Sequence, residues 1–312
     1  MSTVRQDLAP IGLFAFKRPR HLRTALMSLS ANPEFSLSPL YIFCDGARRA
    51  EDVPLIAQVR EEARSFQHPH KRVVEQSSNL GLAQSISAGV SRMCEMHGTA
   101  IVIEEDLTVS PVFLNYMNEA LRRYAANEQV MQVVGHVYPS RLRSRNDAVM
   151  LPMTSTLGWA TWQRAWKHFD PEMRGRFALE TDAKMRRRFD LDGSYPYWQM
   201  LNQQLAGGVD SWGIKWYLSV FLRGGLGVFP TQTLVAHEFD GTGTHCAIPQ
   251  HRSQRLRLDP IGQWPSAEID AVAFEDMKRY LRRDRSLPVR VARALGARLH
   301  RATRWLSPRS SG

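Results

Sequence analysis

Three adjacent carboxylates, Glu104, Glu105 and Asp106, directly follow the apolar run 100–103. Like charges at neighbouring positions repel one another, so a folded chain keeps such a cluster at modest cost where a cation binds it. Hard divalent ions such as Mg²⁺ and Mn²⁺ take carboxylate oxygens and share their remaining positions with phosphates. The triplet therefore indicates a metal–diphosphate site, and the alternative is a solvated acidic loop after a strand.

The elements that would position this triplet alternate between strands and helices. Apolar runs predict five strands, at 11–16, 40–44, 72–74, 100–103 and 130–135. Apolar stripes at helical spacing follow the first four runs, with Asp52 and Ser110 as expected helix caps and Pro111 as a first helical residue. This series predicts an α/β fold whose mostly parallel central sheet is flanked by helices. Ligands of such sheets bind at the carboxyl ends of the strands, where the triplet falls.

The pattern changes near residue 151, where tryptophans and glycines become dense and short helices within irregular structure are expected. We predict one domain over residues 1–265, with two halves at 1–150 and 151–265. A basic helical extension at 266–312 follows it.

Composition limits the possible classes of protein. The 312 residues contain no apolar run near the roughly 18 residues that a membrane span needs, and no secretory signal at the start. The cysteines, Cys44, Cys94 and Cys246, have no CxxC spacing, which favours reduced thiols. These features predict a cytoplasmic protein.

The net charge of +11 is concentrated at the C-terminus, where residues 278–309 carry eleven Lys/Arg and one acid. Residues 288–306 have apolar and basic side chains on opposite sides at helical spacing, which predicts a helix on the anionic inner face of a membrane. The alternative is a helix docked on the domain. Charge confined to an appendage argues against nucleic-acid binding, which would show as a salt-sensitive affinity for DNA or RNA.

Short motifs recur in a collinear order: Phe16-Lys17-Arg18, Cys44-Asp45-Gly46, Asn79-Leu80-Gly81, Glu104-Glu105-Asp106-Leu107 with Ser110-Pro111, Leu157-Gly158-Trp159, Asp210-Ser211-Trp212, and Phe239-Asp240-Gly241-Thr242-Gly243-Thr244-His245. In this order they are similar to the GT-A class of nucleotide-sugar-dependent glycosyltransferases. Within that class the chain resembles the N-acetylglucosaminyltransferase I type and its bacterial relatives, from about residue 10 to residue 245. The resemblance implies a GT-A fold, a UDP-sugar donor and Mn²⁺ or Mg²⁺. It also implies that residues 1–265 are the glycosyltransferase domain, with a nucleotide-binding half at 1–150 and an acceptor and sugar half at 151–265.

The resemblance also implies a role for each matching residue. The donor would be bound by Arg18 at the diphosphate, Asp45 at the uracil base, Glu104 at the sugar, Leu157 and Trp159 in the sugar pocket, and by Asn79, Gly81 and Glu105. The metal would be bound by Asp106 and His245. The family's triplet often reads Glu-Asp-Asp, so the role of Glu105 stays open. Its histidine-containing turn is replaced here by residues 76–79, so those base contacts do not transfer.

Asp210 would be the general base that takes a proton from the acceptor hydroxyl, and a single base opposite the leaving group predicts inversion. Its alternative role is a helix cap before Trp212. His245 has the alternative of an ordinary loop residue, with His237 and Glu238 as weaker candidates nearby. The basic tract 185–188 is expected to be a solvated helix face, or else a contact to acceptor phosphate.

Together these features predict a metal-dependent, inverting glycosyltransferase acting on a cell-surface or lipid-linked glycan in polysaccharide biosynthesis. Two alternatives belong to other classes. A sugar nucleotidyltransferase would need a glycine-rich loop after the first strand, where this chain has Phe16-Lys17-Arg18-Pro19. A non-catalytic scaffold at the membrane would bind ligands without turnover.

Overall fold

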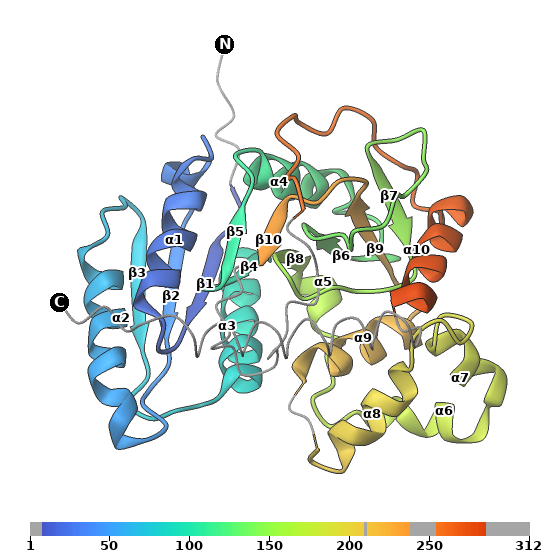
Figure 1. Cartoon of the computed structure of the whole chain (residues 1–312), viewed down its shortest axis with the longest axis horizontal. Coiled ribbons are helices and arrows are strands. Elements are labelled where there is room, and N and C mark those ends of the chain that lie inside the picture. The colour runs from blue at the N-terminus through green and yellow to red at the C-terminus, as the bar shows by residue number, and fades with distance from the viewer. Residues whose placement is uncertain (1–7, 209–210, 238–253, 285–312) are drawn as a thin grey trace, which may run out of the picture.

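The computed structural model describes residues 8–208, 211–237 and 254–284, shown in colour in Figure 1. The strands in this part of the chain are β1 (Ile11–Ala15), β2 (Leu40–Cys44), β3 (Lys71–Glu75), β4 (Thr99–Glu104), β5 (Leu107–Val109), β6 (Val130–Val134), β7 (Ala148–Leu151), β8 (Trp159–Trp162), β9 (Leu226–Pro230) and β10 (Val235–His237). The α-helices are α1 (Pro19–Ser30), α2 (Val53–Ser65), α3 (Leu82–His97), α4 (Phe113–Arg123), α5 (Gln163–Trp166), α6 (Phe177–Thr181), α7 (Ala183–Phe189), α8 (Tyr197–Leu205), α9 (Trp212–Leu222) and α10 (Ala271–Asp284). Short 3-10 turns lie at Phe35–Leu37, Ala50–Asp52 and Arg174–Arg176.

Within the described residues, the central sheet has eight strands in the order β3-β2-β1-β4-β8-β6-β9-β7, and β5 and β10 form a separate pair. The four strands from β3 to β4 are mutually parallel, as predicted. The other half is mixed, because β8 runs antiparallel to both β4 and β6, and β7 runs antiparallel to β9. The predicted α/β class with helices on both sides of the sheet is therefore confirmed.

The first helices form where the apolar stripes predict them. The buried residues of α1 are Leu22, Ala25, Leu26 and Leu29, which lie three or four positions apart and face the sheet. Pro19 occupies the first turn, where a missing N–H costs nothing. Burial of the three leucines contributes roughly 5–9 kcal/mol of hydrophobic free energy.

One expected helix cap is wrong, and the other lies at the predicted position without a capping hydrogen bond. The residues that follow the triplet, Leu107–Val109, form strand β5. Helix α4 therefore begins only at Phe113, and Ser110 and Pro111 lie before it. The Ser110 hydroxyl instead donates to the Arg257 carbonyl. Asp52 makes no side-chain cap of α2. Its carboxylate accepts from Lys17 Nζ at 2.9 Å and from the Arg49 N–H at 3.2 Å.

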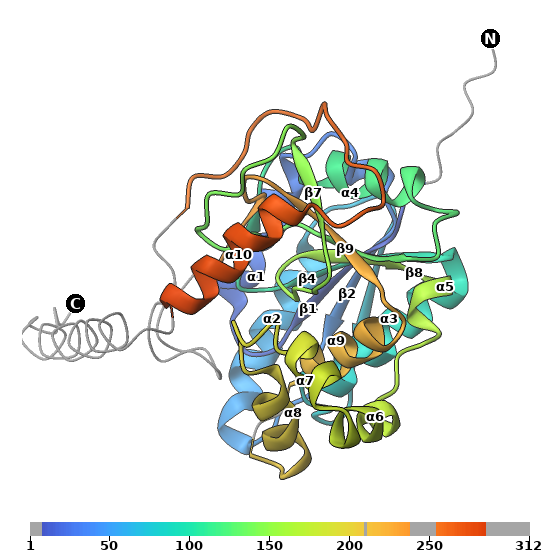
Figure 2. The same ribbon diagram turned by 90° about the vertical axis from the view of Figure 1, so that its right-hand side faces the viewer.

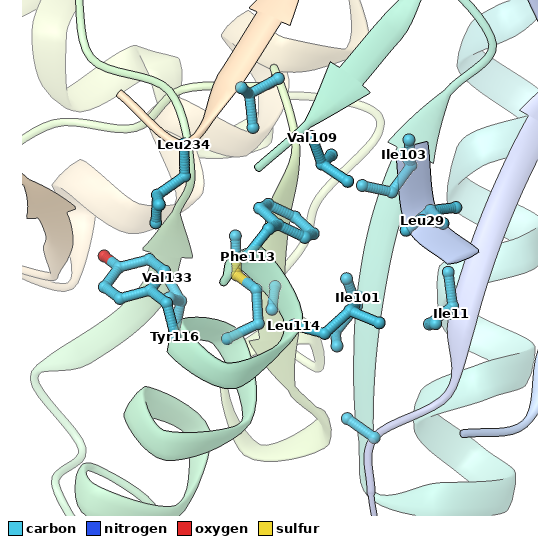
Figure 3. Packing of buried hydrophobic residues seen from close by; sticks show 14 of the residues in the cluster. Ile11, Leu29, Ile101, Ile103, Val109, Phe113, Leu114, Tyr116, Val133 and Leu234 are labelled. Carbon is cyan, nitrogen blue, oxygen red and sulfur yellow. The ribbon is translucent and has the colours of Figure 1, made fainter. Parts of the chain in front are cut away.

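One face of the sheet is covered by α1, α2 and α4. Figure 3 shows Phe113 and Tyr116 of α4 in the layer of apolar side chains that includes Ile101 of β4 and Ile11 of β1. The Tyr116 hydroxyl donates to the Val228 carbonyl at 3.0 Å, which satisfies its polar atom within the core. This face fixes β1 beside β4, and so fixes the ends of these strands.

The opposite face is covered by α3 and by the helices from α5 to α9, as Figures 1 and 2 show. Strands from residues 1–150 and from residues 151–265 belong to the same sheet, and α10 packs its buried Ala273, Met277 and Leu281 near β7. The division into two halves plus an extension stays a prediction. The amphipathic stretch 288–306 lies outside the described residues, and no described helix has the length and apolarity to cross a bilayer.

Candidate functional site

The acid triplet lies at the carboxyl edge of the parallel half of the sheet. In the register of β1 with β4, Phe14 lies opposite Glu104, and the Glu105 N–H donates to the Phe14 carbonyl at 3.0 Å. The chain leaves β1 at this same edge and reaches Arg18 just before α1. Strand pairing thus brings a cation from one loop beside the carboxylates of another.

Arg18 bridges two of the three carboxylates. Its Nε donates to Glu105 Oε1 at 2.8 Å, and its Nη2 donates to Asp106 Oδ2 at 2.9 Å. The Arg18 side chain is 21% exposed and that of Asp106 is 13% exposed, while Glu105 is buried. The guanidinium fork suits this double contact better than a lysine ammonium would.

His237 is the second cation-forming group at Asp106. Its Nε2 lies 3.4 Å from Asp106 Oδ2, and its side chain is exposed. The antiparallel pairing of β10 with β5 places His237 opposite Leu107, the residue after the triplet. Sequence reasoning ranked His237 below His245, because nothing in the local pattern of residues 107–109 identified a strand that would pair with residues 235–237.

The electrostatics of the triplet differ from one residue to the next. Loss of hydration raises the pKa of Glu104 well above its ordinary value, and the charges of Asp106 and Glu105 add to this effect. Burial also raises the pKa of Glu105, against the opposing charge of Arg18. Burial acts on Asp106 in the same direction, but His237 and Arg18 outweigh it and lower the pKa of Asp106. Asp106 is therefore the member of the triplet that its surroundings hold as an anion.

Asp45 ends β2 at the same edge, and its carboxylate is surrounded by donors. Oδ1 accepts from the N–H groups of Gly46 and Leu80 at 2.8 Å each. Oδ2 accepts from Asn79 Nδ2 and from the Gly81 N–H at 3.0 Å each. A carboxylate has about four lone-pair positions, so Asp45 holds the turn before α3 in place. The expected contact of Asp45 with a base stays a prediction, and it would add a fifth donor or replace one of these four.

Asn79 and Gly81 belong to this braced turn. Asn79 Nδ2 also donates to the Gly46 carbonyl at 2.9 Å. Gly81 has φ +76°, a left-handed backbone conformation that a side chain disfavours. A Cβ on Gly46 would lie 2.3 Å from the carbonyl carbon of Ser78, so the two loops touch through their backbones. Glycine at 46 is required by this close approach.

Trp159 lies away from any surface. It is fully buried, its ring centroid lies 5.2 Å from that of Trp212, and it also packs against Trp166 and Trp216. These four tryptophans bury one another in one core cluster, and the expected role of Trp159 at a sugar stays a prediction. Leu157 is half-buried against the other core, and its role at a sugar stays a prediction.

A buried histidine that sequence reasoning did not single out lies after β6. Strand β6 runs in the same direction as β4, because both are antiparallel to β8. His136, two residues beyond β6, therefore falls at the edge that carries the acid triplet, with its ring centroid 5.4 Å from that of Tyr138. Asp210 and His245 lie outside the described residues, so their roles stay predictions.

The residues at Asp106 fit a hard divalent ion. The carboxylate of Asp106 faces an imidazole at 3.4 Å, and an ion of this type takes one or two protein ligands and completes its shell with phosphate oxygens and water. Within residues 8–208, 211–237 and 254–284, no group of three or more His, Cys, Asp or Glu side chains is arranged to hold an ion. Asp106 and His237 are a pair of side chains in this part of the chain that could act as ligands.

Comparisons with known proteins give weak likenesses. No protein-family model and no curated protein sequence matches the chain. Among solved structures, it is similar to glucosyl-3-phosphoglycerate synthase from Mycobacterium tuberculosis in complex with Mn²⁺, UDP and phosphoglyceric acid, with 14% identity and a TM-score of 0.32 over 52% of this chain and 57% of that one. It is also similar to S. aureus TarS, with 6% identity and a TM-score of 0.40 over 75% of this chain and 37% of that one.

For residues 1–349 of S. aureus TarS, the identity is 9% and the TM-score 0.37 over 70% of this chain and 71% of that one. The chain thus spans 57% and 37% of the length of the first two structures. TM-scores below 0.5 at such low identity carry no argument about function. The functional assignment therefore rests on the chain's own strands, charges and contacts.

Proposed function

We propose that this chain is a metal-dependent, inverting glycosyltransferase of the GT-A type that uses a UDP-sugar donor. The observation that carries the proposal is the arrangement of Arg18, Glu105, Asp106 and His237 at the carboxyl edge of a parallel sheet. One guanidinium, two carboxylates and one imidazole meet there at the end of β4. Such an edge is where α/β folds bind phosphorylated ligands.

In the proposed reaction, the acceptor oxygen attacks the anomeric carbon of the donor sugar and the bond from that carbon to the diphosphate breaks. Asp106 and His237 would hold a divalent ion, which would supply positive charge beside the departing diphosphate. Arg18 donates hydrogen bonds to the same phosphates, and this contact strengthens as negative charge grows on them. Asp210 takes the proton of the acceptor hydroxyl, and attack opposite the leaving group inverts the sugar.

The acceptor is proposed to be a cell-surface or lipid-linked glycan. The prediction that residues 288–306 bind an anionic membrane belongs to this proposal. Co-sedimentation with phosphatidylserine or phosphatidylglycerol vesicles tests it. Deletion of residues 286–312 is expected to abolish sedimentation, and unchanged sedimentation would contradict a membrane role for the tail.

The function itself is tested by UDP release from a panel of UDP-sugars with Mn²⁺ and a mixture of glycan acceptors. We expect release that EDTA stops and that falls by at least about 100-fold in Asp106→Asn, the loss typical of removing one charge-stabilising group. Asp259→Asn, an exposed acid far along the chain, is the matched control. Binding of UDP-sugars without release under any acceptor would favour the scaffold instead.

A further inference from the structure

We propose that Arg18 couples the binding of the divalent ion to the binding of the nucleoside diphosphate. Its guanidinium contacts the Asp106 carboxylate oxygen that the ion would need, and it would transfer to the diphosphate when the ion takes that position. This inference rests on the proposed function for the identity of the two ligands. Its content is a specific role for one arginine in linking them.

The geometry places Arg18 in competition with an ion. Asp106 Oδ2 accepts from Arg18 Nη2 at 2.9 Å, and His237 Nε2 lies 3.4 Å from the same oxygen. An ion that joins Asp106 to His237 would therefore sit beside the guanidinium. A divalent ion and a guanidinium that share one carboxylate oxygen repel each other strongly in a partly desolvated site. Binding of the ion alone thus requires that Arg18 leave Asp106.

A second hydrogen bond, to Glu105, allows the Arg18 guanidinium to leave Asp106 and still remain paired. Its Nε donates to Glu105 Oε1 at 2.8 Å, and Glu105 is buried. Rotation of the guanidinium about this contact would break the bond to Asp106 and keep the bond to Glu105. This geometry gives Glu105 a role that sequence comparison left open: it keeps the arginine at the site while its second partner changes.

The charge balance makes the coupling positive. Burial lowers the pKa of Arg18, but Glu105 and Asp106 more than compensate and keep the guanidinium charged. A charged guanidinium that is only 21% exposed is destabilised when one of its two carboxylate partners is taken away. A diphosphate supplies replacement acceptors in the bidentate geometry that arginine favours. Each ligand therefore removes part of the cost of binding the other, and by linkage the two affinities rise by the same factor.

The experiment measures that factor by isothermal titration of UDP at zero and at saturating Mn²⁺, and of Mn²⁺ alone. Protein-free titrations supply the correction for Mn²⁺–UDP association in water. For the wild-type chain we expect Mn²⁺ to raise UDP affinity at least 10-fold. In Arg18→Gln, Mn²⁺ alone should bind more tightly than to wild type, and the factor should fall to below about 3-fold.

Arg20→Gln is the matched control, because Arg20 is an exposed arginine two residues along the same segment, and it should behave as wild type. Arg18→Lys retains the charge, and it should show an intermediate factor, which keeps the test usable if Arg18→Gln folds poorly. An unchanged factor in both Arg18 variants, or weaker binding of Mn²⁺ alone, would overturn the coupling while leaving the proposed function intact. Failure of the wild-type chain to bind Mn²⁺ and UDP in any combination would instead overturn the function, and the coupling with it.

Discussion

Replacement of Asp45 by alanine should destabilise the folded chain in the absence of any ligand. The buried carboxylate accepts four hydrogen bonds, from the N–H groups of Gly46, Leu80 and Gly81 and from Asn79 Nδ2. A hydrogen bond to a charged group contributes about 1.5–3 kcal/mol, and such values are not additive. Water reaches the half-buried N–H groups of Leu80 and Gly81 after the substitution, so we expect a loss of about 3–5 kcal/mol in unfolding free energy.

The expected loss converts into a measurable shift of the melting temperature. At about 2.1 cal/mol/K per residue, unfolding of 312 residues carries an entropy of roughly 0.66 kcal/mol/K. A loss of about 3–5 kcal/mol then lowers the midpoint by about 5–8 °C. Asp45→Asn keeps the shape of the side chain and one oxygen that can still accept hydrogen bonds. Its melting temperature should therefore fall less than that of Asp45→Ala. Differential scanning calorimetry of the ligand-free protein measures both, with Asp259→Ala as the exposed control.

A midpoint for Asp45→Ala within about 1 °C of wild type, far short of the expected shift, would refute this reasoning. If UDP affinity fell in the same variant, Asp45 would be a ligand of the base whose hydrogen bonds inside the protein matter little. A large shift of the midpoint in Asp45→Ala, together with UDP binding that is weakened in that variant and recovered in Asp45→Asn, would show that the primary role of Asp45 is to hold the turn.

Three further results are expected. Gly46→Ala should cost at least about 2 kcal/mol in chemical denaturation, because its Cβ would lie 2.3 Å from the Ser78 carbonyl carbon; an unchanged unfolding curve would contradict the backbone contact. Trp159→Ala should lower the unfolding free energy by about 3–5 kcal/mol, because it leaves a cavity in the tryptophan cluster. Thermal denaturation measures this loss; unchanged stability with a raised KM for the donor would instead support a role in the sugar pocket. The hydrogen bonds from Arg143 lower the pKa of Asp276 from 3.8 to about 2, so this pair should contribute stability above about pH 4 and lose it as the pH falls towards 2. Because Arg143 is exposed, we expect this contribution to be about 1–2 kcal/mol. Urea titrations of wild type and Asp276→Asn at pH 7 and at about pH 2 should show a difference in unfolding free energy that is much smaller at the lower pH; an equal difference at both would exclude the linkage.

Much of the fold of residues 1–150 could be predicted because its signals are local. The apolar run of β2 and the stripe of α1 each occupy consecutive or regularly spaced positions, and packing on the sheet does not override them. The triplet lies at the end of β4 for the same reason. A strand that ends in charged residues marks its own boundary.

The contacts that define the site are not local, and the sequence does not reveal them. β5 has three residues and pairs with β10, which begins at Val235. A strand this short resembles a loop until its partner is known, so the approach of His237 to Asp106 could not be foreseen. The burial of Trp159 could not be foreseen for a related reason. Its neighbours in the motif suggested a pocket, while its burial depends on Trp212 and Trp216, which lie far along the chain.

We propose that Asp106 holds a divalent ion at the diphosphate of a donor. The most direct test is anomalous diffraction at the manganese edge from crystals soaked with UDP and Mn²⁺. We predict an anomalous peak within about 2.5 Å of an Asp106 carboxylate oxygen, with phosphate oxygens of UDP on the same ion and the guanidinium of Arg18 turned towards the diphosphate. Bound UDP with no manganese at Asp106, and with Arg18 still paired to that carboxylate, would contradict the account.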